Sequence, residues 1–203
     1  SDWAQDWGNL LAVATVSNSE IDYGYDYDWT YEGFHPWAWR DVDNYYRDRD
    51  ARSLDIRAQS KSSDISWVVG MYLRTADEDV ENYGLGNSLN FTGEYQPDNQ
   101  AAYGELKWQL NDKTRLTGGL RVDNFSFDYA DSNGFSHSMD ETMVGGKLVL
   151  DYQTSADAMW YASVSRGYKA GGFNPAPQVA EEQIIFDAEY NWNYEIGYKA
   201  SFD

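Results

Sequence analysis

The segment between Asn18 and Ala51 holds the residue types best suited to binding a ligand. It carries nine acidic residues against three basic ones. Its ten aromatic residues are Tyr23, Tyr25, Tyr27, Trp29, Tyr31, Phe34, Trp37, Trp39, Tyr45 and Tyr46. Aromatic faces can stack on sugar or heterocycle rings, and carboxylates can accept hydrogen bonds or hold a cation. The segment therefore predicts four ligand-binding residues, which are Trp37, Trp39, Tyr45 and Tyr46.

The sequence gives less support for metal binding, phosphate binding or catalysis. The chain has no cysteine, and its two histidines, His35 and His137, lie about a hundred residues apart in predicted loops. The acidic run at 77–79 lacks the spacing of a calcium loop. Neither a Walker lysine nor a Gly-x-Ser-x-Gly elbow is present. We therefore predict no catalytic residue, no enzyme activity, no cofactor and no metal site.

Composition limits the class of protein. The 203 residues carry a net charge of −19 and a mean hydropathy of −0.71, which is typical of disordered chains. However, 17% of the residues are aromatic, which indicates an ordered structure. The negative charge argues against nucleic acid as a partner. The longest apolar run, at 8–16, is about half of the roughly 18 residues that a membrane-spanning helix needs.

Alternating hydrophobicity predicts eight β-strands. Along 102–110 one face reads Ala, Gly, Leu, Trp, Leu, and the other carries Tyr103, Glu105, Lys107 and Gln109. Successive side chains of a strand point to opposite faces, so such a segment has one apolar and one polar side. The eight segments are 9–17, 54–59, 67–74, 102–110, 115–123, 143–151, 159–168 and 194–201.

The connections alternate in length. Short ones are predicted at 61–64, 111–113 and 153–158, and long ones at 18–51, 76–100, 128–141 and 170–190. An antiparallel up-and-down meander with short turns at one rim and long loops at the other is the layout of a transmembrane β-barrel. We expect both chain ends to lie with the short turns. A soluble antiparallel sandwich also alternates its faces, but its strands usually have only about 5–6 residues.

The apolar and polar faces of the predicted strands are expected to meet different environments. The apolar face would meet lipid, and it comprises Trp67, Val69, Met71, Leu73, Leu106, Trp108, Leu116, Leu120, Val122, Leu148, Leu150, Ile196 and Tyr198. The polar face would line a lumen with the basic residues Arg57, Arg74, Lys107, Arg115, Arg121 and Lys147. These bases can form an ion-pair ladder with Asp55, Glu105 and Asp123, or an anion path or docking surface. The alternating rings from Tyr23 to Tyr31 could instead continue a strand and belong to the interfacial aromatic girdle.

Several motifs resemble one family. Residues 160–175, WYASVSRGYKAGGFNP, resemble a strand of TonB-dependent outer-membrane receptors that climbs to the outer rim. Residues 189–199, EYNWNYEIGYK, resemble the acidic strand that follows it, and 102–121 resembles a hairpin of the same barrels. The resemblance implies an outer-membrane receptor or transporter that takes up a siderophore, cobalamin or glycan.

The chain also departs from that family. The family barrel has 22 strands and a plug domain, and 22 strands of about 10 residues need roughly 220 residues. No stretch resembles the plug, and the chain ends on Phe202-Asp203 rather than on an aromatic residue. We therefore expect residues 1–203 to be a single internal barrel segment without an internal domain boundary.

The resemblance also implies partners. These are outer-membrane lipid, the remaining strands and plug of the parent receptor, a small solute, and an energy-coupling protein that acts only through the plug. Two alternatives stay open at this point. The chain could be a self-contained eight-stranded barrel with a structural or adhesive role, or a soluble, acidic, aromatic-rich binding module.

Overall fold

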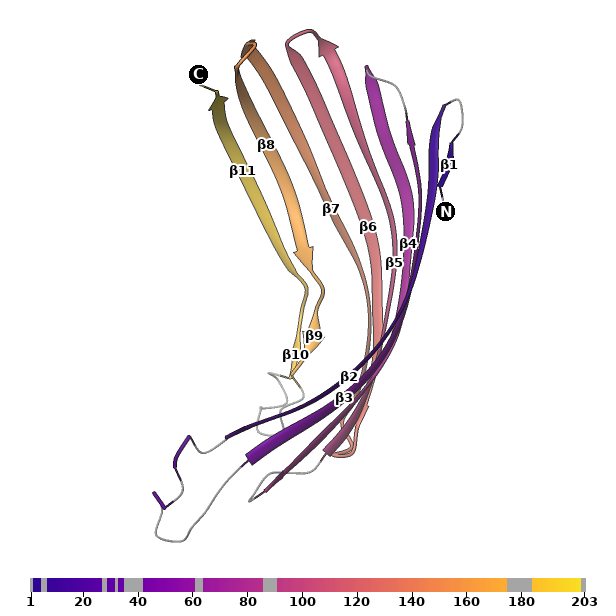
Figure 1. Cartoon of the computed structure of the whole chain (residues 1–203), viewed down its shortest axis with the longest axis vertical. Coiled ribbons are helices and arrows are strands. Elements are labelled where there is room, and N and C mark those ends of the chain that lie inside the picture. The colour runs from indigo at the N-terminus through magenta and orange to yellow at the C-terminus, as the bar shows by residue number, and fades with distance from the viewer. Residues whose placement is uncertain are drawn as a thin grey trace.

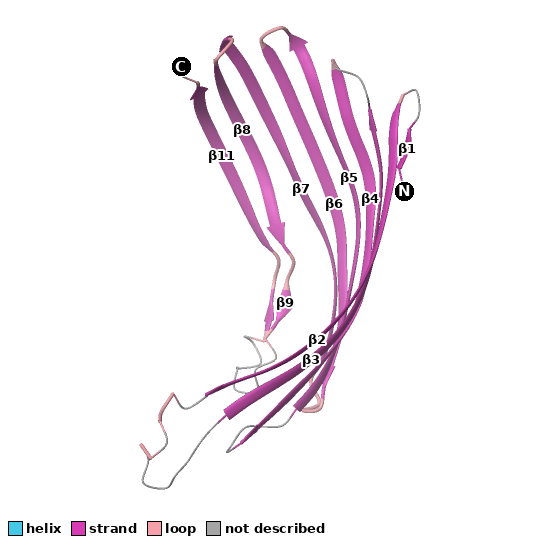
Figure 2. Ribbon diagram, in the orientation of Figure 1, coloured by secondary structure: helices cyan, strands magenta, loops and turns pink. Residues whose placement is uncertain are grey.

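Eight long antiparallel strands form one curved sheet in the computed structural model (Figure 1). The structure describes residues 2–4, 7–26, 29–31, 33–34, 42–60, 64–85, 91–174 and 184–201. The long strands are β2 (Gly8–Asp26), β3 (Val42–Ser60), β4 (Ile65–Leu85), β5 (Phe91–Asn111), β6 (Thr114–Asp131), β7 (Ser136–Ser155), β8 (Ala158–Lys169) and β11 (Glu189–Ala200). The all-β meander predicted from alternation is confirmed, and the described residues contain only strands and loops (Figure 2). None of them forms a helix that could cross a membrane.

Three short strands complete the fold. β1 (Asp2–Ala4) pairs with the start of β2, and β9 (Gly172–Phe173) pairs with β10 (Ile185–Phe186) in a separate hairpin. The main sheet runs from β1 through β2 to β8 and ends at β11. Within the described residues this sheet is open, because β11 at one end pairs only with β8 and not with β1 or β2 at the other end. The eight strands therefore do not close on themselves as a complete small barrel.

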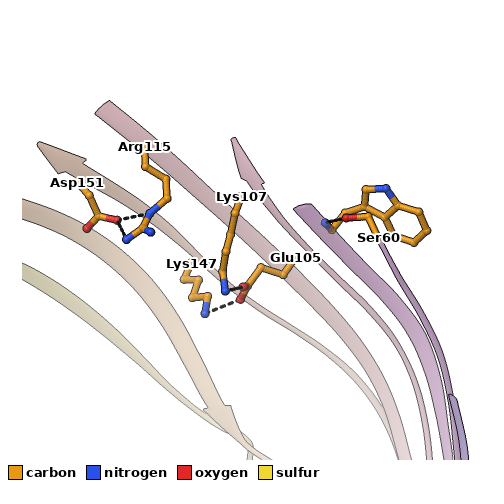
Figure 3. Close-up of polar contacts among 7 residues, drawn as sticks. Ser60, Glu105, Lys107, Arg115, Lys147 and Asp151 are labelled. Carbon is orange, nitrogen blue, oxygen red and sulfur yellow. Dashed lines mark hydrogen bonds and ion pairs between the residues drawn. The ribbon is translucent and has the colours of Figure 1, made fainter. Parts of the chain in front are cut away.

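The two rims of the sheet differ as predicted. The C-terminal ends of β3, β5, β7 and β11 lie at one rim, with β1 beside it (Figure 1). There the Trp67 backbone N–H donates to the Ser60 hydroxyl at 3.0 Å (Figure 3). The C-terminal ends of β2, β4, β6 and β8 lie towards the opposite rim. We call these the short-turn rim and the long-connection rim.

The strands are longer than the alternation predicts, and this corrects the predicted loops. β4 and β5 have 21 residues each, so the connection expected at 76–100 is reduced to 86–90. The connections expected at 18–51 and 128–141 are likewise reduced to 27–41 and 132–135. Beyond Leu73 the outward positions of β4 become Thr75, Asp77 and Asp79. The outward face is polar there, so the apolar alternation ends although the backbone ladder continues.

The apolar face of the sheet is exposed. Cross-strand pairs such as Trp67 with Leu106 place all thirteen predicted outward residues on one face, and none of them is buried. Leu120 is 58% exposed and Ile196 is 77% exposed. The buried hydrophobic side chains, by contrast, lie on the other face and are Ala76, Ala101, Phe127, Tyr129 and Met143. Two packed sheets would bury the apolar face, so the soluble sandwich is wrong.

The apolar face is the convex one, and aromatic residues border it. Hairpin β9–β10 lies inside the curve of the sheet (Figure 1), where Phe173 contacts Phe127 of the polar face. On the convex face, Trp160 packs on Tyr198 near the short-turn rim, with ring centroids 4.9 Å apart. Aromatic rings at such a place are expected where the lipid-facing band of an outer-membrane barrel ends.

Candidate functional site on the concave face

An ion-pair ladder covers the concave face near the short-turn rim (Figure 3). Arg115 contacts Asp151 at 2.8 Å, and the Glu105 carboxylate is shared by Lys107 at 3.2 Å and Lys147 at 2.6 Å. Two further pairs join Arg57 to Asp55 at 3.9 Å and Arg121 to Asp123 at 2.7 Å. The predicted ladder is confirmed. Since each of these bases has an acidic partner, this part of the wall carries little excess charge.

A buried carboxylate ties three strands together above the ladder. Asp123 of β6 is 4% exposed and accepts two hydrogen bonds from Arg121, at 2.7 and 2.8 Å. It also accepts one from the Asn99 amide of β5 at 3.1 Å and one from the Tyr168 hydroxyl of β8. The Arg121 guanidinium in turn lies 5.7 Å from the ring centroid of Tyr103. The network fixes the end of β8 against β6.

The chain after β8 folds over the concave face. Pairing between β7 and β8 ends at Arg166, and β9 then brings Phe173 onto an aromatic cluster. The Phe173 ring centroid lies 4.1 Å from Tyr129, 5.2 Å from Phe127 and 5.6 Å from Tyr95. Apolar contact of this kind, together with the Tyr168–Asp123 bond, holds the hairpin inside the curve.

Gly145 makes this docking possible, and a substitution there tests it. A Cβ at Gly145 would lie 2.5 Å from the Tyr168 ring, which Asp123 holds in place. We expect Gly145→Ala to release the hairpin and to raise hydrogen exchange at the Asn174 amide, which donates to the Ile184 carbonyl at 2.7 Å. Gly118→Ala is the matched control, because its Cβ would meet only Leu148, at 3.9 Å. Equal protection in both variants would show that Tyr168 does not hold the hairpin.

Arginine side chains line a hollow on the long-connection half of the concave face. The hollow measures about 460 Å³, and its lining includes Arg47 and Arg49 of β3 and Arg74 and Glu78 of β4. Glu78 lies 3.7 Å from both Arg47 and Arg49, and each arginine side chain is 45% exposed. Among the described residues Arg74 has no ion pair. We call these four residues the arginine hollow, and it has more positive than negative side chains.

The arginine hollow borders the aromatic cluster at Tyr95. Burial raises the pKa of the Tyr95 phenol, and the nearby Glu78 carboxylate adds to this, whereas Arg74 and Arg49 lower it. The same tyrosine ring contacts Phe127, with centroids 5.4 Å apart. The positive hollow and the aromatic cluster therefore form one continuous surface.

A tyrosine stack lies beyond the hollow, towards the long-connection rim. The Tyr45 ring stacks on Tyr23 at 5.3 Å and on Tyr25 at 6.1 Å. The hydroxyls of Tyr25 and Tyr45 donate to the Asp43 carboxylate at 2.9 and 3.3 Å. Partial burial, followed by this hydrogen bond, raises the pKa of the Tyr25 phenol. Tyr23 and Tyr25 thus lie on the concave face, so their predicted place in the lipid-facing girdle is wrong, although the predicted strand continuation is confirmed.

Comparison with known proteins decides the family. All residues from 1 to 203 match the model of the TonB dependent receptor-like β-barrel. The chain belongs to the TonB-dependent receptor family. It is therefore an outer-membrane barrel segment of a receptor family rather than of an enzyme family. In such barrels the turns are periplasmic and the long connections extracellular, which places the arginine hollow and the tyrosine stack on the extracellular half.

The individual relatives of this TonB-dependent receptor segment described next have sequence identities of 28% or less. The pesticin receptor of Yersinia enterocolitica is 28% identical over 159 residues, which are 73% of this chain and 24% of that protein. The ferric yersiniabactin uptake receptor FyuA of Yersinia pestis superposes with a TM-score of 0.81 at 22% identity, over 99% of this chain and 32% of that one. The copper transporter OprC superposes with a TM-score of 0.72 at 16% identity, over 98% and 35%. The chain thus spans about a quarter to a third of the length of these relatives.

The receptor fold separates the four predicted ligand-binding residues. Tyr45 lies in the tyrosine stack on the concave face. Tyr46 faces the convex side between Asp22 and Glu81. Trp37 and Trp39 lie outside the described residues.

The histidines and the arginines of the site differ from expectation. His35 lies outside the described residues, and His137 is a residue of β7 beside Phe127 rather than of a loop. Arg47 and Arg49 were not among the residues predicted from the sequence to bind a ligand. The alternation Asp43-x-Tyr45-x-Arg47-x-Arg49 along 43–49 was the signal that could have found them.

Proposed function

We propose that the parent protein of this chain takes up a ferric siderophore across the outer membrane, and that the arginine hollow contributes to binding it. One observation carries the proposal. In a chain with a net charge of −19, the extracellular half of the concave face gathers Arg47, Arg49 and Arg74 around a single Glu78. Ferric complexes of carboxylate, phenolate or catecholate chelators are commonly anionic. A positive, partly enclosed surface concentrates such solutes and speeds their capture.

Further features support this function. FyuA carries ferric yersiniabactin uptake in its name, and its barrel has the same fold. The aromatic cluster beside the hollow offers flat faces to a chelator that contains rings. Tyr45 near the long-connection rim and Tyr46 on the convex side are proposed as further ligand contacts. Trp37 and Trp39, which lie outside the described residues, are proposed as two more.

Under this proposal the chain forms one part of a larger receptor. Residues 1–203 would be one segment of the barrel, with no domain boundary inside it. The remaining strands and the plug would come from the rest of the parent protein. The energy-coupling protein would act through that plug, and lipid would cover the convex face.

Charge removal tests this function. In the full-length receptor, Arg49→Ala or Arg74→Ala should weaken binding of ferric yersiniabactin about 10–100-fold, because hydrogen bonds to charged groups contribute roughly 1.5–3 kcal/mol. Quenching of tryptophan fluorescence measures the affinity. Arg115→Ala is the matched control, because it removes an arginine of the same face that is paired with Asp151 near the short-turn rim.

Two outcomes would overturn the proposal. One is equal affinity in all three variants. The other is binding of a neutral glycan, cobalamin or Cu(II) in place of the ferric complex, and Cu(II) binding would favour a route like that implied by the name of OprC.

A further inference from the structure

We infer that Asp43, Tyr25 and Tyr45 form a direct binding site for a hard trivalent cation, Fe(III), on the concave face near the long-connection rim. The inference goes beyond the proposed function, because the protein's own oxygens, rather than a chelator, would hold the ion. We call these three residues the tyrosine–aspartate trio.

The first observation is the buried charge of Asp43. Asp43 is 8% exposed, and none of the ion pairs among the described residues includes it. Its hydrogen bonds come from two phenols and from the Asn82 amide, which donates to Oδ1 at 2.5 Å. Buried carboxylates are usually paired with a cation or bound to a metal. Among the described residues Asp43 has neutral partners only, and none of them supplies a positive charge.

The second observation is the spacing of the oxygens. The hydroxyls of Tyr25 and Tyr45 both approach Oδ2 of Asp43, at 2.9 and 3.3 Å. Around a small octahedral ion with bonds of about 2.0–2.1 Å, neighbouring oxygens lie about 2.9 Å apart. Both phenol oxygens therefore already lie within about 0.4 Å of this spacing from the shared Oδ2, so an ion could bind all three oxygens with little movement.

The third observation is that the site is held rigidly yet open to the lumen. Asn82, which is 4% exposed, fixes Oδ1 and leaves Oδ2 to the phenols. Stacking on Tyr45 orients the Tyr25 ring, and Tyr25 remains 42% exposed. An ion arriving along the concave face can reach the phenol oxygens without unfolding the strands, and water can complete its shell.

The donor set selects the kind of ion. A carboxylate and phenol oxygens are hard ligands, and tyrosinate is a known ligand of iron in proteins. A phenol must lose its proton to bind a metal, and hydrogen bonding to Asp43 makes that loss harder here. A trivalent ion supplies the needed charge where Mg²⁺ or Ca²⁺ does not. On binding, the two phenol protons leave to solvent, and two phenolates and one carboxylate balance the three charges of Fe(III).

A spectroscopic titration tests the site. The purified full-length receptor is titrated in detergent with Fe(III) supplied as its weak nitrilotriacetate complex. We expect a visible tyrosinate-to-iron charge-transfer band that saturates at one iron per protein. In Tyr25→Phe or Tyr45→Phe the apparent affinity should fall about 10–100-fold, as it does when a metal site loses a supporting group. Both variants keep the ring and therefore the stack.

Tyr83→Phe serves as the matched control, and folding is measured separately from iron binding. Tyr83→Phe removes another phenol–carboxylate bond, from Tyr83 to Asp22 at 3.1 Å on the convex face, and should leave the band unchanged. Heat-modifiable gel migration checks that each variant is folded. The inference is overturned by the absence of a band, or by a band that survives in Tyr25→Phe and Tyr45→Phe. Either result leaves the siderophore proposal standing, because that proposal is judged by binding of the preformed ferric complex.

Discussion

Asp123→Ala should lower the free energy of unfolding of the full-length receptor by about 2–4 kcal/mol. Removing one partner of a buried ion pair typically costs about 3–5 kcal/mol, and the 38% exposure of the Arg121 side chain reduces this because water can solvate the remaining charge. The same substitution also removes the carboxylate that accepts hydrogen bonds from Asn99 and Tyr168. Urea unfolding followed by gel mobility measures the shift of the midpoint at constant slope.

Asp151→Ala serves as the comparison for that experiment. It breaks the Arg115 pair, whose arginine side chain is 49% exposed, so we expect a loss of only about 0.2–1 kcal/mol. The difference between the two variants reports the burial of Asp123 rather than the mere loss of a carboxylate. Equal midpoints in both would contradict the buried network.

The eight strands could be predicted because the membrane imposes a simple pattern. In 102–110 and 115–123 every outward side chain must be apolar or small, and every inward one can be polar. The pattern holds only along the part of each strand that faces lipid. It therefore located the strands and their order, and it placed the two rims correctly.

The ends of the strands could not be predicted, because the convex face becomes polar there while the concave face mixes aromatic and charged residues. Glu20, Asp48, Asp79 and Glu94 lie opposite one another on four successive strands, on the convex face beyond the apolar band. A row of carboxylates has no hydrophobic period, and in the sequence alone it is indistinguishable from a solvated loop. Only the continuing backbone pairing identifies these residues as strand.

The candidate site was hidden for a different reason. Asp43 and Tyr45 are close in the sequence, but Tyr25 and Asn82 come from the neighbouring strands on either side. Their meeting depends on register, which a single sequence does not provide. The docking of Phe173 onto Tyr129 depends in addition on where β8 leaves β7. Residue types in this region indicated a binding surface, but not which side chains share it.

Leu120→Arg is the second substitution with a large expected effect, and it tests whether the convex face of the sheet contacts lipid. Outward positions along β6 run from the polar Thr114 through Leu120 to the polar Asn124, so Leu120 lies near the middle of the apolar band. An arginine at the midplane of a barrel's lipid face costs about 2–4 kcal/mol, and the cost falls to about 0–1 near the interfaces. We therefore expect a loss of about 2–4 kcal/mol, measured by urea unfolding in lipid vesicles.

Ser163→Arg is the matched control for this prediction. Ser163 lies on the concave face opposite Glu195, where a new arginine meets water and an opposite charge. We expect the control to change the free energy of unfolding by less than about 1 kcal/mol, as exposed ion pairs do. A similar cost at both positions would mean that lipid does not cover the convex face. A cost confined to Leu120→Arg would assign the convex face to the membrane and leave the concave face to the solute.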